Sequence, residues 1–217
     1  MKILSCDDHD LFRKGLAEAL RLLDPDAELL EASTAQEMLE QVAAHEDLDL
    51  LLLDHGLPDT DGLDLLDGLR ERFPAVPVVM ISGTEDPELV RAVLDRGAVG
   101  FVPKTAPSGV LVGALRLVLA GGVYVPPLAL EGAPLRSGRA RDAQRRRLAA
   151  NLTPRQEETL RLMAKGLTNR EIAGILGIGV TTVKGHVAAI LEALEVSNRT
   201  EAVMAMVELG LADADEG

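Results

Sequence analysis

The 217-residue sequence has a single cysteine and no long apolar run. Cys6 has no second cysteine with which to form an internal disulfide, and its place in an apolar stretch predicts a buried structural thiol without chemistry. The longest aliphatic run near the N-terminus, Leu50–Leu53, is far too short to span a bilayer, and acidic residues begin as early as Asp7. We therefore expect a cytoplasmic protein without an export or membrane segment.

Basic residues are scarce in the first part of the chain. Residues 1–125 hold 10 Lys and Arg against 23 Asp and Glu, residues 126–147 hold 6 against 2, and residues 148–217 hold 6 against 10. The resulting charges of −13, +4 and −4 account for the net charge of −13. Such an anionic excess argues against non-specific nucleic-acid binding by the first part and favours a cation site there.

Short apolar runs alternate five times with segments that carry apolar residues at helical spacing. The predicted strands are Ile3–Cys6, Ala27–Glu31, Leu48–Leu53, Val76–Ile81 and Val99–Val102. The predicted helices are Asp10–Leu23, Thr34–Ala44, Asp61–Phe73, Pro87–Arg96 and Pro107–Leu119. Strands that are apolar on both faces and joined by helices predict an α/β fold with a doubly wound, five-stranded parallel sheet. Ligands of such sheets bind at the carboxyl ends of the strands.

The pattern breaks after Gly122, which predicts a first domain over residues 1–122. Residues 123–150 contain Pro126-Pro127, further glycines and the basic run Arg145–Arg147, as is typical of an interdomain linker. Residues 151–217 then read as a small all-α domain. The two domains are of a size that allows each to bury its own core.

Helix-start signals divide the second domain into four helices. Thr153 precedes a proline and a glutamine at capping-box spacing, and Thr168 and Asn198 each precede a glutamate by three positions. A further helix begins after the Gly177–Gly179 turn. The last three predicted helices are Asn169–Leu176, Val180–Ala193 and Arg199–Leu211.

Polar residues follow four of the five predicted strands in the first domain. They are Asp7, Asp8, Asp54, Ser82 and Lys104. Each alone has an ordinary explanation as a helix cap, a turn residue or a solvated charge. Together they predict one site, where three carboxylates would repel one another unless a cation such as Mg²⁺ lay among them. Lys104 and Ser82 would then contact a phosphoryl group carried by a carboxylate nucleophile.

The first domain resembles the receiver domain of response regulators of the NarL/FixJ family. The matching motifs are Ile3-Leu4-Ser5-Cys6-Asp7-Asp8-His9, Leu51-Leu52-Leu53-Asp54-His55-Gly56-Leu57-Pro58-Asp59, Val79-Met80-Ile81-Ser82-Gly83 and Gly100-Phe101-Val102-Pro103-Lys104. The resemblance implies that Asp54 is the phosphoacceptor and that Asp7, Asp8, Asp54 and the Gly56 carbonyl bind Mg²⁺. It also implies the following switch and phosphoryl-binding residues: Ser82, Phe101 and Lys104.

The second domain resembles the LuxR-type helix-turn-helix domain. The matching motifs are Leu152-Thr153-Pro154-Arg155-Gln156, Gly166-Leu167-Thr168-Asn169-Arg170-Glu171-Ile172-Ala173, Thr182-Val183-Lys184-Gly185-His186-Val187 and Val196-Ser197-Asn198-Arg199-Thr200-Glu201-Ala202. In such a domain Val180–Ala193 is the recognition helix and Arg199–Leu211 offers an apolar face for dimerisation. The candidates to face DNA are Thr181, Thr182, Lys184, Gly185 and Ala188.

Taken together, the resemblances imply a transcription regulator rather than an enzyme. They imply phosphorylation of Asp54 by a sensor histidine kinase in the presence of Mg²⁺, a homodimer on activation, and binding to paired DNA half-sites. The recognition helix carries only one lysine, Lys184, and the domain is acidic, so few basic groups can contact DNA phosphates. One alternative is therefore a regulator that acts through protein contacts, with weak or no DNA binding.

A second alternative is an aspartyl-phosphate hydrolase of the haloacid dehalogenase type. Asp8-His9-Asp10 forms an acidic pair just after the first strand. That motif would need threonine or valine two places after Asp10, where Phe12 stands, and it leaves Asp54 without a role.

Overall fold

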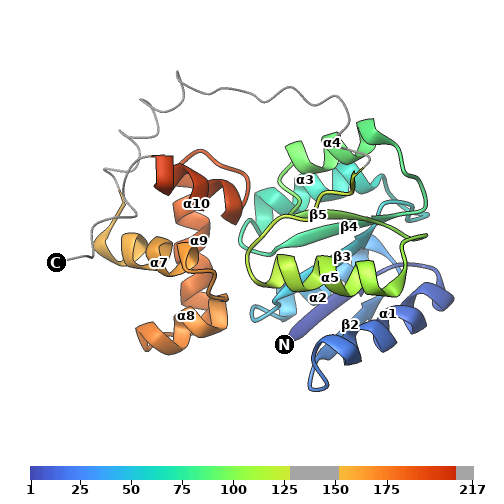
Figure 1. Cartoon of the computed structure of the whole chain (residues 1–217), viewed down its shortest axis with the longest axis horizontal. Coiled ribbons are helices and arrows are strands. Elements are labelled where there is room, and N and C mark those ends of the chain that lie inside the picture. The colour runs from blue at the N-terminus through green and yellow to red at the C-terminus, as the bar shows by residue number, and fades with distance from the viewer. Residues whose placement is uncertain (128–151, 209–217) are drawn as a thin grey trace.

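The computed structural model describes residues 1–127 and 152–208. Figure 1 shows an α/β domain with a small helical domain beside it. The predicted linker lies outside the described residues from position 128 to position 150, as does the predicted end of the last helix at Leu211.

The first domain is built on a five-stranded parallel sheet, as predicted. Its strands are β1 (Lys2–Cys6), β2 (Glu28–Ala32), β3 (Leu50–Asp54), β4 (Val78–Ser82) and β5 (Gly100–Pro103). They lie in the order β2-β1-β3-β4-β5. After β1 the chain places β2 on one side of it and then β3, β4 and β5 in turn on the other. Strands β3 and β4 are buried along their whole length.

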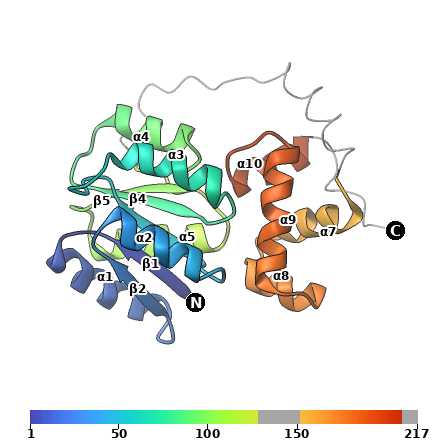
Figure 2. The same cartoon turned by 180° about the vertical axis from the view of Figure 1, so that it is seen from behind.

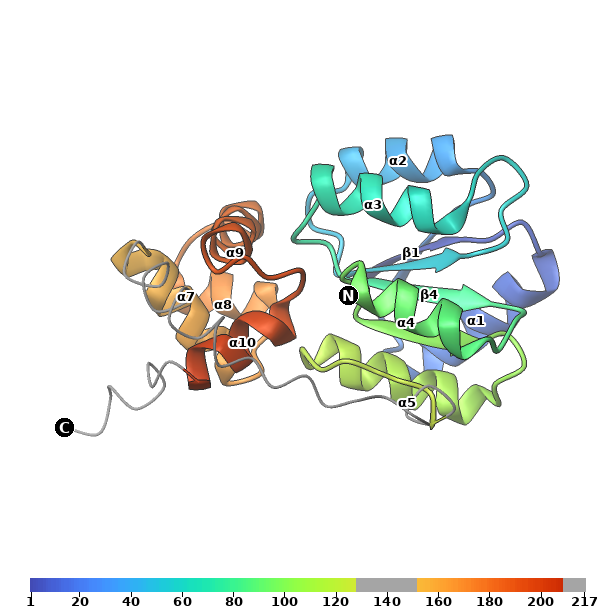
Figure 3. The same ribbon diagram turned by 90° about the horizontal axis from the view of Figure 1, so that it is seen from above.

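Helices cover both faces of this sheet (Figure 3). They are α1 (Asp10–Leu23), α2 (Ala35–Ala44), α3 (Gly62–Arg72), α4 (Pro87–Asp95) and α5 (Ser108–Leu119). Helices α2, α3 and α4 bury their apolar stripes in one cluster, and α1 and α5 bury theirs in the other. Because strand residues alternate between faces, the run Leu50–Leu53 supplies both clusters.

The second domain has the four predicted helices within the described residues. They are α7 (Pro154–Ala164), α8 (Asn169–Leu176), α9 (Val180–Ala193) and α10 (Arg199–Glu208). The capping boxes predicted at Thr153 and Thr168 both form, each with its reciprocal side-chain bond. Gly177 ends α8 in the left-handed conformation, with φ of 64°.

No single helix among the described residues is long and apolar enough to cross a bilayer. The α8 and α9 pair reaches the required apolar length only when the two helices are counted together, and they meet at a bend of 110°.

The helical domain docks on the edge of the sheet where the strands begin (Figure 2). Leu48 lies just before β3 and accepts a hydrogen bond of 2.6 Å from Lys184 Nζ on α9. Gly121 follows α5 and accepts a hydrogen bond of 2.9 Å from the Thr200 hydroxyl on α10. The sequence predicted two domains but not this contact between them.

Gly97, in the turn between α4 and β5, lies against the backbone of the helical domain. Its φ is +86°, and a Cβ there would lie 2.8 Å from the Ser197 carbonyl oxygen. Only glycine fits both constraints without movement of the backbone.

We expect Gly97→Ala to lower the free energy of unfolding by roughly 1–3 kcal/mol and to loosen the docking of the helical domain. Gly113→Ala is the matched control, because that helical glycine has nothing within 4 Å of the added carbon and should gain about 0.5–1 kcal/mol. Urea unfolding and small-angle scattering measure the two effects. Equal stability of both variants would contradict the assigned packing.

Candidate functional site

An acidic cluster with one lysine lies at the carboxyl ends of the strands. Asp54 ends β3, Asp7 follows β1, and both carboxylates are buried, at 2% and 1% exposure. Lys104, just after β5, places its Nζ 2.7 Å from Asp54 Oδ2 and 2.9 Å from Asp7 Oδ2. Three separate strands therefore deliver these groups to one point, as the sequence predicted.

The two carboxylates hold Lys104 in its charged form. Burial acts to lower the pKa of Lys104, but hydrogen bonds to Asp54 and Asp7 outweigh it and raise that pKa above its ordinary value. A fixed positive charge thus lies against the Asp54 carboxylate. It can stabilise negative charge that is added to Asp54 Oδ2.

Asp8 and His9 complete the cluster. Asp8 is partly exposed, and its Oδ1 lies 2.6 Å from His9 Nδ1. The same ring nitrogen lies 3.2 Å from Asp7 Oδ1 and 3.9 Å from Asp54 Oδ2. One ligand atom from each of Asp7, Asp8, His9 and Asp54 lies within 4.8 Å of the others. His9 was not predicted as a site residue, and the one signal for it in the sequence is its position directly after an acidic pair.

The donor set fits a hard divalent cation. Asp7 Oδ2 is buried and has no hydrogen-bond partner, although Lys104 Nζ is near it. Carboxylate oxygens beside open water positions are what small divalent cations prefer. A cation would satisfy this oxygen and reduce the repulsion among the three carboxylates.

The remaining predicted residues surround Asp54. The Gly56 N–H donates to Asp54 Oδ1 at 3.0 Å, and the buried Ser82 hydroxyl accepts from the Thr84 N–H at 3.1 Å. Phe101 is fully buried in the core beneath α4. The Phe101 ring thus already lies in the core of the domain in this structure. A switch at this position would not need to turn the ring inward from here.

Comparison with known proteins agrees with this geometry. The response regulator receiver domain matches residues 3–116, and the bacterial regulatory proteins of the luxR family match residues 150–206. The chain belongs to the response regulators with a LuxR-type output domain. These response regulators are transcription regulators and not enzymes, and receiver domains bind a divalent cation at an acidic cluster of this kind. The hydrolase alternative fails, since its nucleophile would be the partly exposed Asp8, while Asp54 holds the buried position beside Lys104.

Relatives of this response regulator match over nearly its whole length. A glycerol metabolism activator of Pseudomonas putida is 37% identical over 207 residues, which cover 94% of this chain and 93% of the relative. The nitrate/nitrite response regulator protein NarL of Escherichia coli K12 is 35% identical and covers 93% of each chain. A solved LuxR family DNA-binding response regulator from Silicibacter pomeroyi is 35% identical, with a TM-score of 0.52, over 58% of this chain and 98% of its own.

The predicted DNA-facing side of α9 is partly covered by the receiver of this response regulator. Lys184 was expected to face solvent, but it is only 9% exposed and donates to the Leu48 carbonyl. The Thr181 hydroxyl donates to Glu46 Oε2 at 2.9 Å. Thr182 and Gly185 stay exposed, and Ala188 is half-buried beside the receiver. The sequence could not reveal this, because nothing in a helical pattern tells which neighbour will cover an outward-facing residue.

Burial of Lys184 makes domain docking depend on pH. Loss of water around the ammonium lowers the pKa of Lys184 to about 8, while the carboxylates of Asp49, Asp47 and Glu46 oppose the shift and Lys2 adds to it. Once the domains separate, that pKa returns towards its ordinary 10.5. When the pH lies between 8 and 10.5, docking therefore releases a proton from Lys184. Below pH 8 the ammonium keeps its proton, so docking must bury a full positive charge.

We expect the docked fraction to rise as pH increases from 8 to 10.5. Small-angle scattering would report a smaller radius of gyration over this range. Lys184→Met, which keeps the apolar stem and cannot titrate, should remove the change. A pH response of equal size in that variant would show that another group is responsible.

Proposed function

We propose that this response regulator accepts a phosphoryl group on Asp54 from a sensor histidine kinase and thereby controls DNA binding by its helical domain. The observation that carries the proposal is the buried Asp54 carboxylate with the Lys104 ammonium 2.7 Å away. Asp7 is also buried and lies 2.9 Å from the same ammonium, so Asp54 is chosen as the acceptor because it lies in the motif whose resemblance implies the phosphoacceptor.

In the proposed transfer, an Asp54 oxygen attacks the phosphorus of a phosphohistidine. The new oxygen–phosphorus bond forms as the nitrogen–phosphorus bond breaks, and the leaving histidine nitrogen keeps the electron pair. Lys104 balances the added negative charge, and the Gly56 N–H orients the carboxylate through its bond to Oδ1.

Mg²⁺ is the cation we propose for the acidic cluster. Asp7, Asp8, Asp54 and the Gly56 carbonyl would hold it, and when bound it supplies positive charge against the phosphoryl oxygens. His9 contacts the same carboxylates and would help to hold them in position around the cation. Ser82 is proposed to move its hydroxyl from the Thr84 N–H to the phosphoryl group, with Phe101 as the aromatic switch position.

The docked arrangement is proposed to be the form with low DNA affinity. Lys184 cannot reach DNA while it donates to Leu48, and Thr181 is held by Glu46. Phosphorylation of Asp54 would favour separation of the domains, pairing of two helical domains in a homodimer, and binding to two half-sites on the order of 10 bp apart. The names of the NarL and Silicibacter relatives, a response regulator and a DNA-binding response regulator, support this proposal.

We expect Mg²⁺ with a phosphorylated kinase, or with acetyl phosphate, to add one base-labile phosphoryl group to the protein. Asp54→Asn should abolish the addition, because an amide cannot form the acyl phosphate. Intact-mass spectrometry measures it, with Asp64→Asn on the exposed face of α3 as the control. Labelling that persists in Asp54→Asn would move the acceptor elsewhere.

We expect Lys184→Ala to act on docking and on DNA binding in opposite directions. In the phosphorylated protein the substitution should weaken DNA binding by roughly 1–3 kcal/mol if Lys184 contacts a base edge. If Lys184 contacts a phosphate instead, the slope of log affinity against log salt concentration should fall by about one per monomer. In the unphosphorylated protein the substitution relieves the buried charge but also removes the apolar stem and the hydrogen bond to Leu48, and we expect this loss of contact to release the domain in part.

Binding titrations at several salt concentrations separate these effects. Lys14→Ala, which removes an exposed charge from α1, controls for net charge. If the phosphorylated protein shows no sequence preference at low salt, and Lys184→Ala binds like the unmodified chain, the regulator acts through protein contacts instead.

A further inference from the structure

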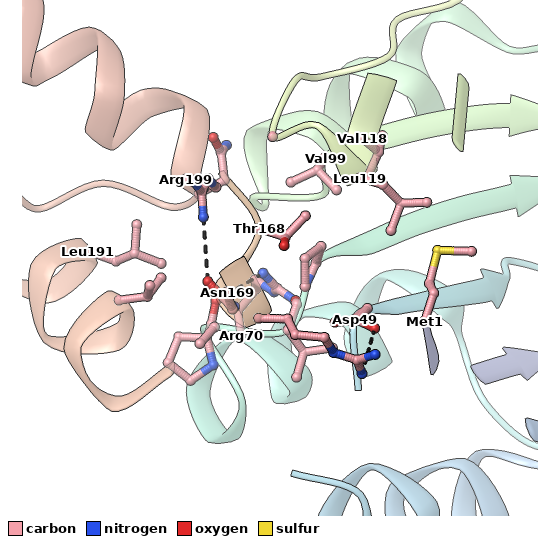
Figure 4. Close-up of a pocket in the computed structure, with 18 residues that line it drawn as sticks. Met1, Asp49, Arg70, Val99, Val118, Leu119, Thr168, Asn169, Leu191 and Arg199 are labelled. Atoms are coloured by element: carbon pink, nitrogen blue, oxygen red, sulfur yellow. Dashed lines mark hydrogen bonds and ion pairs between the residues drawn. The ribbon is translucent and has the colours of Figure 1, made fainter. Parts of the chain in front are cut away.

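A cavity of about 260 Å³ lies between the two domains, far along the sheet from Asp54. Figure 4 shows residues from both domains around it. The receiver supplies Val76, Val99, Val118 and Leu119, and α9 supplies Val187 and Leu191. Most of the wall is therefore apolar, and its size is slightly below the ~300 Å³ at which pockets for drug-sized ligands begin.

Three arginines and one carboxylate interrupt this apolar wall. Arg170 is paired with that carboxylate, Asp49, at 3.4 Å. Arg70 and Arg199 also line the cavity, and within the described ranges neither has a carboxylate at ion-pair distance. The cavity thus carries an excess of positive charge.

Arg70 and Arg199 are held by carbonyl oxygens rather than by acids. Arg70 donates to Pro74 and Val76, so it fastens the loop before β4. Arg199 donates to Met163 at 3.2 Å and to Leu167 at 2.5 Å, and it contacts Asn169 Oδ1 at 3.4 Å (Figure 4).

Each of these two arginines keeps one donor unused. The Nε atoms of Arg70 and Arg199 are buried and have no hydrogen-bond partner. Burial lowers the pKa of both side chains to about 10. At Arg199 the carboxylate of Glu171 acts in the opposite direction, towards a higher pKa. That carboxylate already accepts hydrogen bonds from Thr168 at its Oε2. Both side chains are half-buried, and two guanidinium groups with unpaired Nε atoms beside one cavity favour an anion there.

We propose that this cavity binds a small carboxylic acid with an apolar body, whose carboxylate accepts hydrogen bonds from Arg70 and Arg199. A carboxylate has acceptor sites enough for both guanidinium groups that line the cavity, and a short aliphatic or aromatic body fits the valines and leucines of the wall. Phosphate fits less well, because its further oxygens would face apolar side chains.

Such a ligand would stabilise the docked arrangement. Its binding wall comes from both domains, so separation of the domains destroys the site. The ligand therefore opposes opening by a free energy that grows with the logarithm of the ratio of its concentration to its dissociation constant. This would give the protein a second input that acts at the opposite edge of the sheet from Asp54.

The test follows the two Nε–Hε groups by ¹H–¹⁵N NMR of the full chain. Acetate, butyrate and benzoate are titrated, with benzamide as a neutral match for benzoate and inorganic phosphate as a second anion. We expect benzoate to shift the Arg70 and Arg199 resonances in a saturable way, butyrate to act more weakly, and the exposed Arg72 to stay unchanged. The shifts should persist in Asp54→Asn, so the result does not depend on the phosphoacceptor.

Arg70→Met and Arg199→Met should each raise the dissociation constant of benzoate roughly tenfold or more, whereas Arg72→Met should not. If a variant fails to fold, the Hε shifts of the unmodified chain decide the question. The proposal is overturned if no carboxylate shifts both resonances, if benzamide shifts them as strongly as benzoate, or if phosphate alone shifts them.

Discussion

The structure depends on one constraint: all five strands of the sheet run in the same direction. Every carboxyl end then meets at one edge, and every amino end at the other. The first edge collects Asp7, Asp54 and Lys104 into a charged cluster. The second edge collects Leu48 and the turn at Gly97, on which the helical domain docks. The acidic cluster and the LuxR-type helical domain therefore lie at opposite ends of the receiver.

This separation limits how a signal can pass. A phosphoryl group on Asp54 cannot touch α9, so it can act only by favouring one arrangement of the receiver over another. The core between the two edges is closely packed, with Phe101 fully buried in it. A small displacement near Ser82 would have to change the packing of that core in order to alter the docking edge.

The docking edge also has an unusual electrostatic character. The buried Lys184 and the half-buried Arg70 and Arg199 donate mainly to backbone carbonyls there, whereas Arg170 is paired with an acid, Asp49. Carbonyl oxygens offset part of the cost of burying a cation but do not neutralise it. Docking therefore carries part of the cost of removing these cations from water.

The sequence by itself determined the two domain types, the five strands and the residues of the acidic cluster apart from His9. Alternating apolar runs, capping residues and the carboxyl-end rule are local or topological, so Asp54 and Lys104 could be placed together before their distance was known. Tertiary structure alone decided that Lys184 is buried and that Arg70 and Arg199 meet at one cavity. These residues come from separate domains, and their contact depends on how two complete surfaces fit, which no periodicity along the chain encodes.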